Sequence, residues 1–211
     1  MTRASIIAVA NSKGGVGKTT TTGCLAEHWH RAGRRVVCFD TDRNGNLTTW
    51  LERAKFGVPC TPLDEEEIVG RVLDAATNAD VVMIDVAGSL ARGLLYAISS
   101  ASFVLIPCKP ARTDVTEVAR TQDTLRSAEQ MLRRPIPHAA LLTEVHRRAD
   151  VTRKSRAQLA TLEIPVLAAD LPSRQAYREM SYTGAPLAYP AIREDIAAVA
   201  AELDALTRIC P

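Results

Sequence analysis

The sequence predicts a single α/β domain with a mostly parallel central sheet and helices on both of its faces. Three observations carry this prediction. Short apolar runs alternate with longer segments that have the 3.6-residue apolar period of helices. A glycine-rich segment stands directly between the first apolar run and the first helical segment. Aspartates close the next two apolar runs, and the carboxyl ends of parallel strands are where such folds bind ligands.

The pattern predicts six strands and six helices in alternation. The strands are expected near residues 5–10, 35–40, 81–85, 103–107, 139–143 and 165–168. The helices are expected near residues 19–32, 65–76, 114–133, 151–162, 174–182 and 192–208. A helix between two strands favours parallel pairing, because parallel strands need a crossover connection. Prolines and Gly184 between Pro172 and Pro190 predict an ordered loop around a short helix.

The composition is ordinary for one globular domain, with 46% apolar and 24% charged residues among 211. No apolar stretch reaches the roughly 18 residues that cross a bilayer, and Met1–Ala4 leaves no room for a signal peptide. We therefore expect a cytoplasmic protein. The five cysteines form no C-x-x-C pair and the four histidines are scattered, so the spacing does not support a zinc or iron–sulfur site.

Residues 11–20, Asn-Ser-Lys-Gly-Gly-Val-Gly-Lys-Thr-Thr, have the pattern of a P-loop, although Ser12 stands where the strict pattern has glycine. In such a loop, backbone N–H groups and the positive end of the next helix face the phosphates. Lys18 then contacts the β- and γ-phosphates, and the Thr19 hydroxyl is offered to Mg²⁺. The remaining residues of the expected cradle are Gly14, Gly15, Val16, Gly17 and Thr20.

Carboxylates follow the second and third predicted strands. Asp40 and Asp42 flank one residue at the end of the second strand, and Asp85 ends the third. Mg²⁺ favours carboxylate, phosphate and water oxygens, and a further acid can orient an attacking water. An aspartate-rich turn that binds nothing is the alternative, because such turns are common. The two upstream lysines, Lys13 and Lys18, favour the nucleotide site.

These motifs resemble those of the deviant Walker A ATPases typified by ParA and MinD, whose mark is an early P-loop lysine, here Lys13. The resemblance implies an ATP-bound homodimer in which Lys13 contacts the phosphates of the other subunit; simple solvation of Lys13 is the alternative. Residues 40–44 are similar to the family's Asp-x-Asp-Pro-Gln motif, with Arg43 and Asn44 replacing the last two residues. This implies that Asp42 positions the hydrolytic water and that Asp40 belongs to the magnesium shell.

The resemblance extends over almost the whole chain. It implies that Asp85 is the Walker B carboxylate, holding magnesium through water, and that Gly88 donates its N–H to the γ-phosphate. Residues 171–177 and 184–187 resemble the family's carboxyl-terminal segment, which implies adenine contacts near Pro172. Only four residues precede the first predicted strand, which favours the short, ParF-like plasmid-partition subclass without an amino-terminal DNA-reading extension.

A basic region predicts a polyanion-binding face. Residues 133–178 contain nine basic and four acidic residues. The candidate DNA contacts are Arg147, Arg148, Arg153, Lys154, Arg156, Arg174 and Arg178. Because no base-reading motif is evident, we expect salt-sensitive binding to the DNA backbone without sequence preference. A solvated arginine-rich surface is the alternative for each residue.

The family resemblance also implies a cellular role. It implies slow ATP hydrolysis stimulated by a small centromere-binding protein of the ParB or ParG kind, and a nucleoid-associated homodimer that partitions a plasmid or chromosome. Two other roles stay open: a MinD-like spatial regulator, and an ATP-dependent scaffold that positions cargo. A basic amphipathic carboxyl-terminal helix would favour membrane binding. Because Ile192–Ile209 carries four acidic and two basic residues, we expect no membrane binding.

Overall fold

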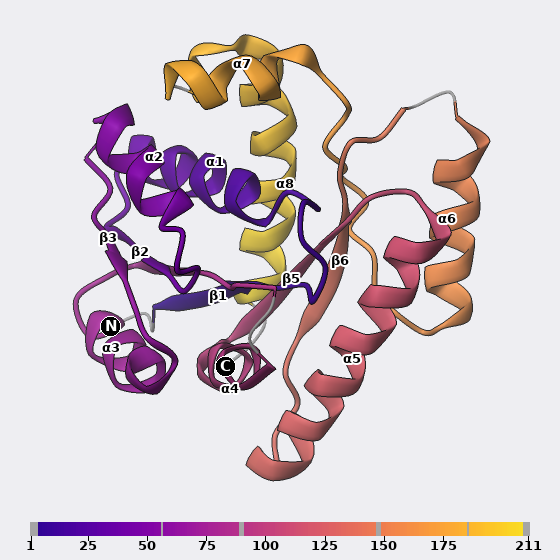
Figure 1. The fold of residues 1–211 in the computed structure, drawn as a ribbon, viewed down its shortest axis with the longest axis horizontal. Coiled ribbons are helices and arrows are strands. Elements are labelled where there is room, and N and C mark those ends of the chain that lie inside the picture. The colour runs from indigo at the N-terminus through magenta and orange to yellow at the C-terminus, as the bar shows by residue number, and fades with distance from the viewer. Residues whose placement is uncertain (1–3, 56, 89–90, 147–148, 185, 209–211) are drawn as a thin grey trace.

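The computed structural model describes residues 4–55, 57–88, 91–146, 149–184 and 186–208. In these residues a six-stranded sheet has the order β3-β2-β4-β1-β5-β6, and every strand pair is parallel (Figure 1). The strands are β1 (Ser5–Val9), β2 (Val36–Asp40), β3 (Cys60–Pro62), β4 (Val81–Asp85), β5 (Phe103–Cys108) and β6 (His138–Leu142). The α/β fold expected from the sequence is therefore confirmed.

Helices cover both faces of the sheet. They are α1 (Lys18–Arg31), α2 (Asn46–Ala54), α3 (Ile68–Ala75), α4 (Ala91–Ser100), α5 (Arg112–Leu132), α6 (Asp150–Thr161), α7 (Gln175–Thr183) and α8 (Pro190–Arg208), with short 3₁₀ turns at Glu65–Glu67 and Pro186–Ala188. In Figure 1, α1, α2, α7 and α8 lie above the sheet, whereas α3, α4 and α5 lie below it.

Alternating strand residues build two apolar cores. In β1, Ile6 and Ala8 pack into the core shared with α3, α4, α5 and α6, while Ile7 and Val9 pack into the core shared with α1, α2, α7 and α8. Strands buried on both faces explain the nearly continuous apolar runs of the sequence. No helix among the described residues is long and apolar enough to cross a membrane.

The register brings three strand ends to one level. Val9 and Asp40 are both paired with Asp85, so β1, β2 and β4 finish side by side. The chain passes from β1 to β2 on one side and from β4 to β5 on the other, which makes β1 a topological switch point. Ligands bind at such points, beyond the carboxyl ends of the strands.

Three expectations differ from the structure. Residues 165–168 do not form a strand; Val166 makes only an isolated bridge with Ala140. The sixth strand is instead β3, which is three residues long and therefore too short to show a pattern. Helices α2 and α4 are additional to the six expected: α2 begins after Gly45, in a segment that resembles a turn because of its Asn-Gly sequence.

Candidate functional site

The P-loop lies at the end of β1, the switch point of the sheet. Gly15 and Gly17 adopt positive φ angles of 72° and 92°, which side chains rarely tolerate, and α1 begins directly after Gly17. Asn11 fixes the start of the loop, because its side-chain amide donates to the Pro107 carbonyl at 2.8 Å and its oxygen accepts the Lys13 N–H at 2.9 Å. Sequence reasoning did not single out Asn11.

Lys18 lies across the loop that precedes it. Its ammonium donates to the carbonyls of Asn11 at 3.0 Å and Lys13 at 2.8 Å. Burial lowers the pKa of Lys18, while the charges of Asp85 and Asp42 act in the opposite direction. A β-carbon on Gly88 would lie 3.1 Å from this ammonium, so glycine is the residue that lets the two segments approach.

Thr19 and Asp85 meet beside Lys18. The Thr19 hydroxyl donates to Asp85 Oδ2 at 2.7 Å. Burial raises the pKa of Asp85 to about 7, and the Thr19 hydrogen bond offsets part of this shift. Asp85 Oδ1 is also buried, and the described residues give it no hydrogen-bond partner. An unsatisfied carboxylate oxygen next to a hydroxyl fits a hard cation such as Mg²⁺, which would favour the ionised carboxylate.

Asp40 organises the loop that carries Asp42. One Asp40 oxygen accepts the Asp42 N–H at 3.0 Å, and the other accepts the Thr48 N–H at 3.0 Å. Asp42 in turn accepts the Asn44 N–H at 2.9 Å. Among the described residues, no three histidine, cysteine or carboxylate side chains are grouped as a metal cage.

Two P-loop side chains are held by α5. The Lys13 ammonium is 2.7 Å from Asp114 Oδ2, and the Ser12 hydroxyl donates to Glu117 at 2.8 Å. Asp114 is 4% exposed at its side chain, whereas Lys13 is 36% exposed. Ser12, which stands where the strict P-loop pattern has glycine, is therefore held by a side-chain hydrogen bond to α5. The Lys18 ammonium contacts the backbone carbonyl of Lys13, whereas the Lys13 ammonium pairs with Asp114.

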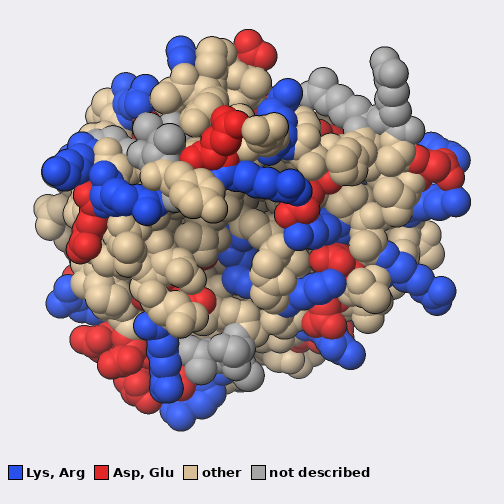
Figure 2. Space-filling model, turned by 45° about the horizontal axis from the view of Figure 1, so that its top comes forward, with Lys and Arg blue, Asp and Glu red and all other residues tan. Residues whose placement is uncertain are grey.

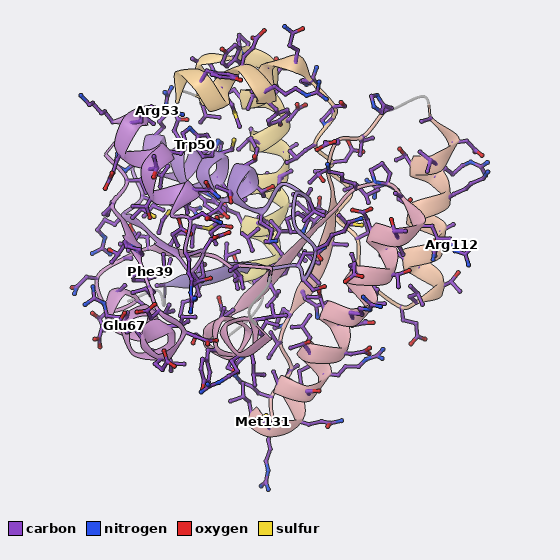
Figure 3. The ribbon with its side chains drawn as sticks, viewed as in Figure 1. Phe39, Trp50, Arg53, Glu67, Arg112 and Met131 are labelled. Carbon is purple, nitrogen blue, oxygen red and sulfur yellow. The ribbon has the colours of Figure 1, made fainter. Side chains whose placement is uncertain are left out.

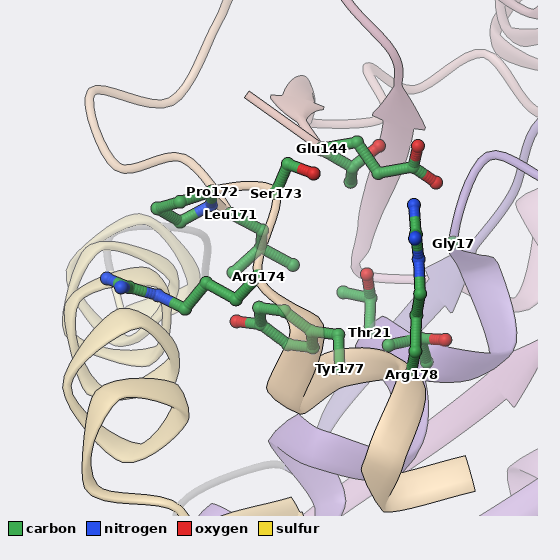
Figure 4. Close-up of a pocket in the computed structure, with 11 residues that line it drawn as sticks. Gly17, Thr21, Glu144, Leu171, Pro172, Ser173, Arg174, Tyr177 and Arg178 are labelled. Atoms are coloured by element: carbon green, nitrogen blue, oxygen red, sulfur yellow. The ribbon is translucent and has the colours of Figure 1, made fainter. Parts of the chain in front are cut away.

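A cavity of about 180 Å³ opens beside α1 (Figure 4). Gly17, Thr20, Pro172 and Tyr177 are among its lining residues. The cavity therefore brings Pro172 and the P-loop residues Gly17 and Thr20 together. Figure 4 shows Arg178 extending toward Glu144 across this cavity.

Arg174 and Arg178, both expected to contact DNA, do not lie on one face of the helix expected near residues 174–182, because α7 begins only at Gln175. Arg174 precedes α7 with an extended backbone, and its guanidinium makes two hydrogen bonds to Asp195 of α8, at 2.7 and 2.9 Å. Figure 4 shows the two arginine side chains pointing in different directions. The buried Asp195 carboxylate needs this partner, so Arg174 has a structural role.

The other expected DNA contacts separate into two groups. Arg153 and Lys154 on α6 are 81% and 72% exposed, and both pair with Asp150. Arg156 instead donates to the carbonyls of Leu167 and Ala168. Arg147 and Arg148 lie outside the described residues. Figure 2 shows basic and acidic side chains intermixed over the visible face.

Comparisons with known proteins agree with this geometry. Residues 7–187 match the family described as the CobQ/CobB/MinD/ParA nucleotide binding domain. The chain is 34% identical over 143 residues to "Protein ParA" of Rhizobium radiobacter, a match that covers 66% of this chain and 64% of that protein, slightly under two thirds of the relative's length. It is 30% identical over 188 residues to "Maintenance of carboxysome distribution protein A" of Halothiobacillus neapolitanus, covering 86% of each.

Solved structures of other proteins share the fold. An ATP complex of a single-residue variant of McdA from Cyanothece superposes with a TM-score of 0.81, at 17% identity, over 97% of this chain and 98% of that one. The cobyrinic acid a,c-diamide synthase of Mycobacterium smegmatis, with bound ATP analogue and magnesium, superposes with a TM-score of 0.69, at 26% identity, over 95% and 96% of the two chains. The chain belongs to the CobQ/CobB/MinD/ParA nucleotide-binding family.

Proposed function

We propose that the chain is a Mg²⁺-dependent ATPase that forms a homodimer with ATP and serves DNA partition. The observation that carries the proposal is the meeting of Lys18, Thr19 and Asp85 at the carboxyl ends of β1 and β4. These are the residue types that phosphoryl transfer needs: a cation for the phosphates, and oxygen ligands for magnesium. The ATP analogue and magnesium bound by the synthase relative support the same ligands here.

Each residue has a role that its position allows. Lys18 would exchange two carbonyl acceptors for phosphate oxygens, which are charged and therefore stronger partners. Thr19 and Asp85 would hold the magnesium ion, which when bound neutralises phosphate charge. Asp40 keeps the loop of Asp42 in place, so that the Asp42 carboxylate can orient water. The cavity at Pro172 and Tyr177 would take the adenine base.

The position of the Lys13 side chain supports the proposed dimer. Its ammonium lies on α5 rather than over its own phosphate site, and it is partly exposed. A second copy of the chain, facing the P-loop, would offer triphosphate oxygens as stronger partners than Asp114 alone. ATP would therefore hold the two protomers together, and hydrolysis would release them.

DNA backbone binding is assigned to Arg153 and Lys154. Both project from α6 into solvent, and their ion pairs with Asp150 are surface contacts that a phosphate can replace at little cost. A dimer presents two such pairs, which raises the effective concentration of the second contact. A small centromere-binding partner would stimulate hydrolysis, in a cytoplasmic, nucleoid-associated protein.

Cargo positioning is the second candidate, and one observation favours it. The carboxysome-distribution relative matches over 86% of both chains, a longer match than that of the ParA relative. The cargo would then be a protein assembly instead of a plasmid. Both candidates share the ATP-dependent dimer and differ in the partner that binds it.

Sedimentation velocity tests the shared part. With Mg²⁺ and a nonhydrolysable ATP analogue, the wild-type protein should shift from monomer to dimer mass, and with ADP it should not. Lys18→Ala is the matched variant and should stay monomeric, because the loss of a charge-assisted contact to phosphate weakens binding about 10- to 100-fold. A wild-type mass that is the same with both nucleotides contradicts the dimer.

Retention assays separate the roles. The ATP-bound protein should be retained on duplex DNA of unrelated sequences and not on vesicles of anionic phospholipid. Retention on the vesicles alone would favour the MinD-like role. Nucleotide-dependent dimers that bind neither surface would favour a scaffold whose partner is a protein.

A further inference from the structure

Thr41 connects two segments of the nucleotide site that are distant in sequence. It is the first residue after β2 and stands between the two aspartates of the loop. Its N–H and its hydroxyl both donate to the Asp85 carbonyl, each at 3.1 Å. Its hydroxyl oxygen also accepts the Ala87 N–H at 2.9 Å. With 4% of its surface exposed, Thr41 makes these contacts inside the protein.

The hydrogen bond between Thr41 and Ala87 holds a segment that is also confined at the next residue, Gly88. Gly88, the next residue, lies so close to the P-loop that a β-carbon there would be 3.0 Å from the Ser12 carbonyl oxygen. The Val86 N–H donates to the Val9 carbonyl, so the hydrogen bonding between β4 and β1 ends one residue before Ala87. The Thr41 hydroxyl therefore holds Ala87, which lies between the last hydrogen bond of the sheet, at Val86, and Gly88.

The same residue precedes Asp42 directly. The Asp42 N–H donates to the Asp40 side chain, so the backbone on both sides of Thr41 is held by hydrogen bonds. Loss of the Thr41 hydroxyl contacts would release the Ala87 N–H and leave the Thr41 N–H as the one contact from Thr41 to the Asp85 carbonyl, which would loosen the start of the Asp42 loop. A hydroxyl on the β-carbon suits this position, because it can donate to one backbone group and accept from another.

We propose that Thr41 is a positioning residue for ATP hydrolysis, holding Asp42 and the Ala87–Gly88 segment in one fixed arrangement. The proposal rests on the proposed ATPase function. In the proposed ATPase, Asp42 from the loop after β2 and Gly88 from the segment after β4 would both act at the reacting phosphate, so both would have to be in place when the water attacks. Small displacements of such groups lower rates strongly, whereas they change binding little, because the P-loop supplies most contacts to the nucleotide.

Two substitutions separate positioning from folding. Thr41→Val keeps the shape and removes the hydroxyl, while Thr41→Ser keeps the hydroxyl and removes the methyl group. Thr121→Val is the matched control, because Thr121 is a buried threonine whose hydroxyl donates to the Glu117 backbone carbonyl within α5. All three are measured for single-turnover hydrolysis of ATP, for affinity toward a nonhydrolysable ATP analogue by calorimetry, and for amide hydrogen exchange without nucleotide.

For Thr41→Val we expect hydrolysis to be about 10- to 100-fold slower, with affinity for the analogue within about threefold of wild type. The Ala87 amide should exchange faster in this variant. Thr41→Ser should restore hydrolysis to within about threefold, and Thr121→Val should change neither quantity. Should Thr41→Val not fold, Thr41→Ala is measured in its place, with the same expectation for Ala87 exchange.

Three results overturn the proposal: unchanged hydrolysis in Thr41→Val, a loss of affinity as large as the loss of rate, or failure of Thr41→Ser to restore the rate. An unchanged Ala87 exchange rate in Thr41→Val also contradicts it, and this measurement needs no nucleotide. Absence of ATP hydrolysis by the wild-type protein is a different outcome, because it removes the proposed function itself.

Discussion

The Lys13 ammonium has partners in its own chain, and the proposed dimer would offer it the phosphates of a second protomer. Its ammonium pairs with Asp114 at 2.7 Å, and a weaker contact reaches the Thr113 hydroxyl at 3.4 Å. Because Asp114 is buried, moving Lys13 to the phosphates of a second protomer would leave this carboxylate without its charged partner, which costs free energy. The intrachain ion pair therefore competes with the contact that Lys13 makes in the proposed dimer.

Asp114→Asn should lower the concentration of ATP analogue needed for dimerisation. A partly exposed ion pair contributes about 0.5–1 kcal/mol, which corresponds to a two- to fivefold change. The midpoint is read from sedimentation velocity at increasing analogue concentration. Asp123→Asn is the control, because it makes the same chemical change at an exposed position of α5 and leaves the Lys13 contact intact. An identical midpoint in Asp114→Asn and wild type would show that the pair does not compete.

Asp42→Ala should separate binding from turnover. A water-orienting acid acts mainly in the transition state, so ATP-dependent dimerisation and DNA retention should persist while hydrolysis falls at least about 100-fold. Phosphate release and sedimentation are measured on the same preparation. Normal hydrolysis in this variant would remove Asp42 from the mechanism.

At the scale of elements, short and local patterns were the predictable ones. The P-loop, the Asp40–Asp42 pair and Asp85 each lie within a few residues of a strand end, and the period of the apolar runs locates those ends. The partners on α5 were not predictable, because Ser12 and Glu117 are 105 positions apart and meet only through packing of α5 beside β5. The sequence feature that could have identified Thr41 is its position between Asp40 and Asp42.

Helix α2 shows why a missed element matters. It carries Thr48, whose N–H fixes Asp40, and it packs on α1 through Trp50 (Figure 3). A β-carbon on Gly23 of α1 would lie 2.3 Å from the Trp50 ring. Gly23 is therefore the residue that lets α2, and with it the Asp42 loop, approach α1. Away from this contact, Met131 near the end of α5 is 73% exposed.

Gly23→Ala should destabilise the protein despite the better helix propensity of alanine. Overpacking costs about 1–3 kcal/mol, while the propensity gain is about 1 kcal/mol, so a net loss near 1 kcal/mol lowers Tm by about 2–4 °C. Thermal unfolding of a double-mutant cycle with Trp50→Leu checks the cause. In the Trp50→Leu background the alanine should no longer destabilise; an equal loss in both backgrounds would exclude the Trp50 contact as the reason.

At the scale of the whole molecule, charge is nearly balanced, with a net charge of +2. Basic and acidic side chains alternate on the visible surface (Figure 2), so no single large field attracts DNA to this face. DNA binding by the proposed dimer would then depend on a few residues presented twice. The sequence indicated the basic region but could not separate Arg156 and Arg174, which hydrogen-bond within the chain, from Arg153 and Lys154.

Reversing both α6 charges, as Arg153→Glu with Lys154→Glu, should weaken retention of the ATP-bound dimer on unrelated duplexes equally. Because each phosphate contact that is lost lowers the slope of log K against log salt concentration by roughly one, the two substitutions should lower it by about two per protomer. Arg71→Glu with Arg193→Glu is the matched control, since it changes the net charge by the same amount on exposed positions of α3 and α8. Equal weakening by both pairs would mean that net charge, rather than the α6 surface, determines DNA binding, and a loss confined to one DNA sequence would contradict backbone recognition.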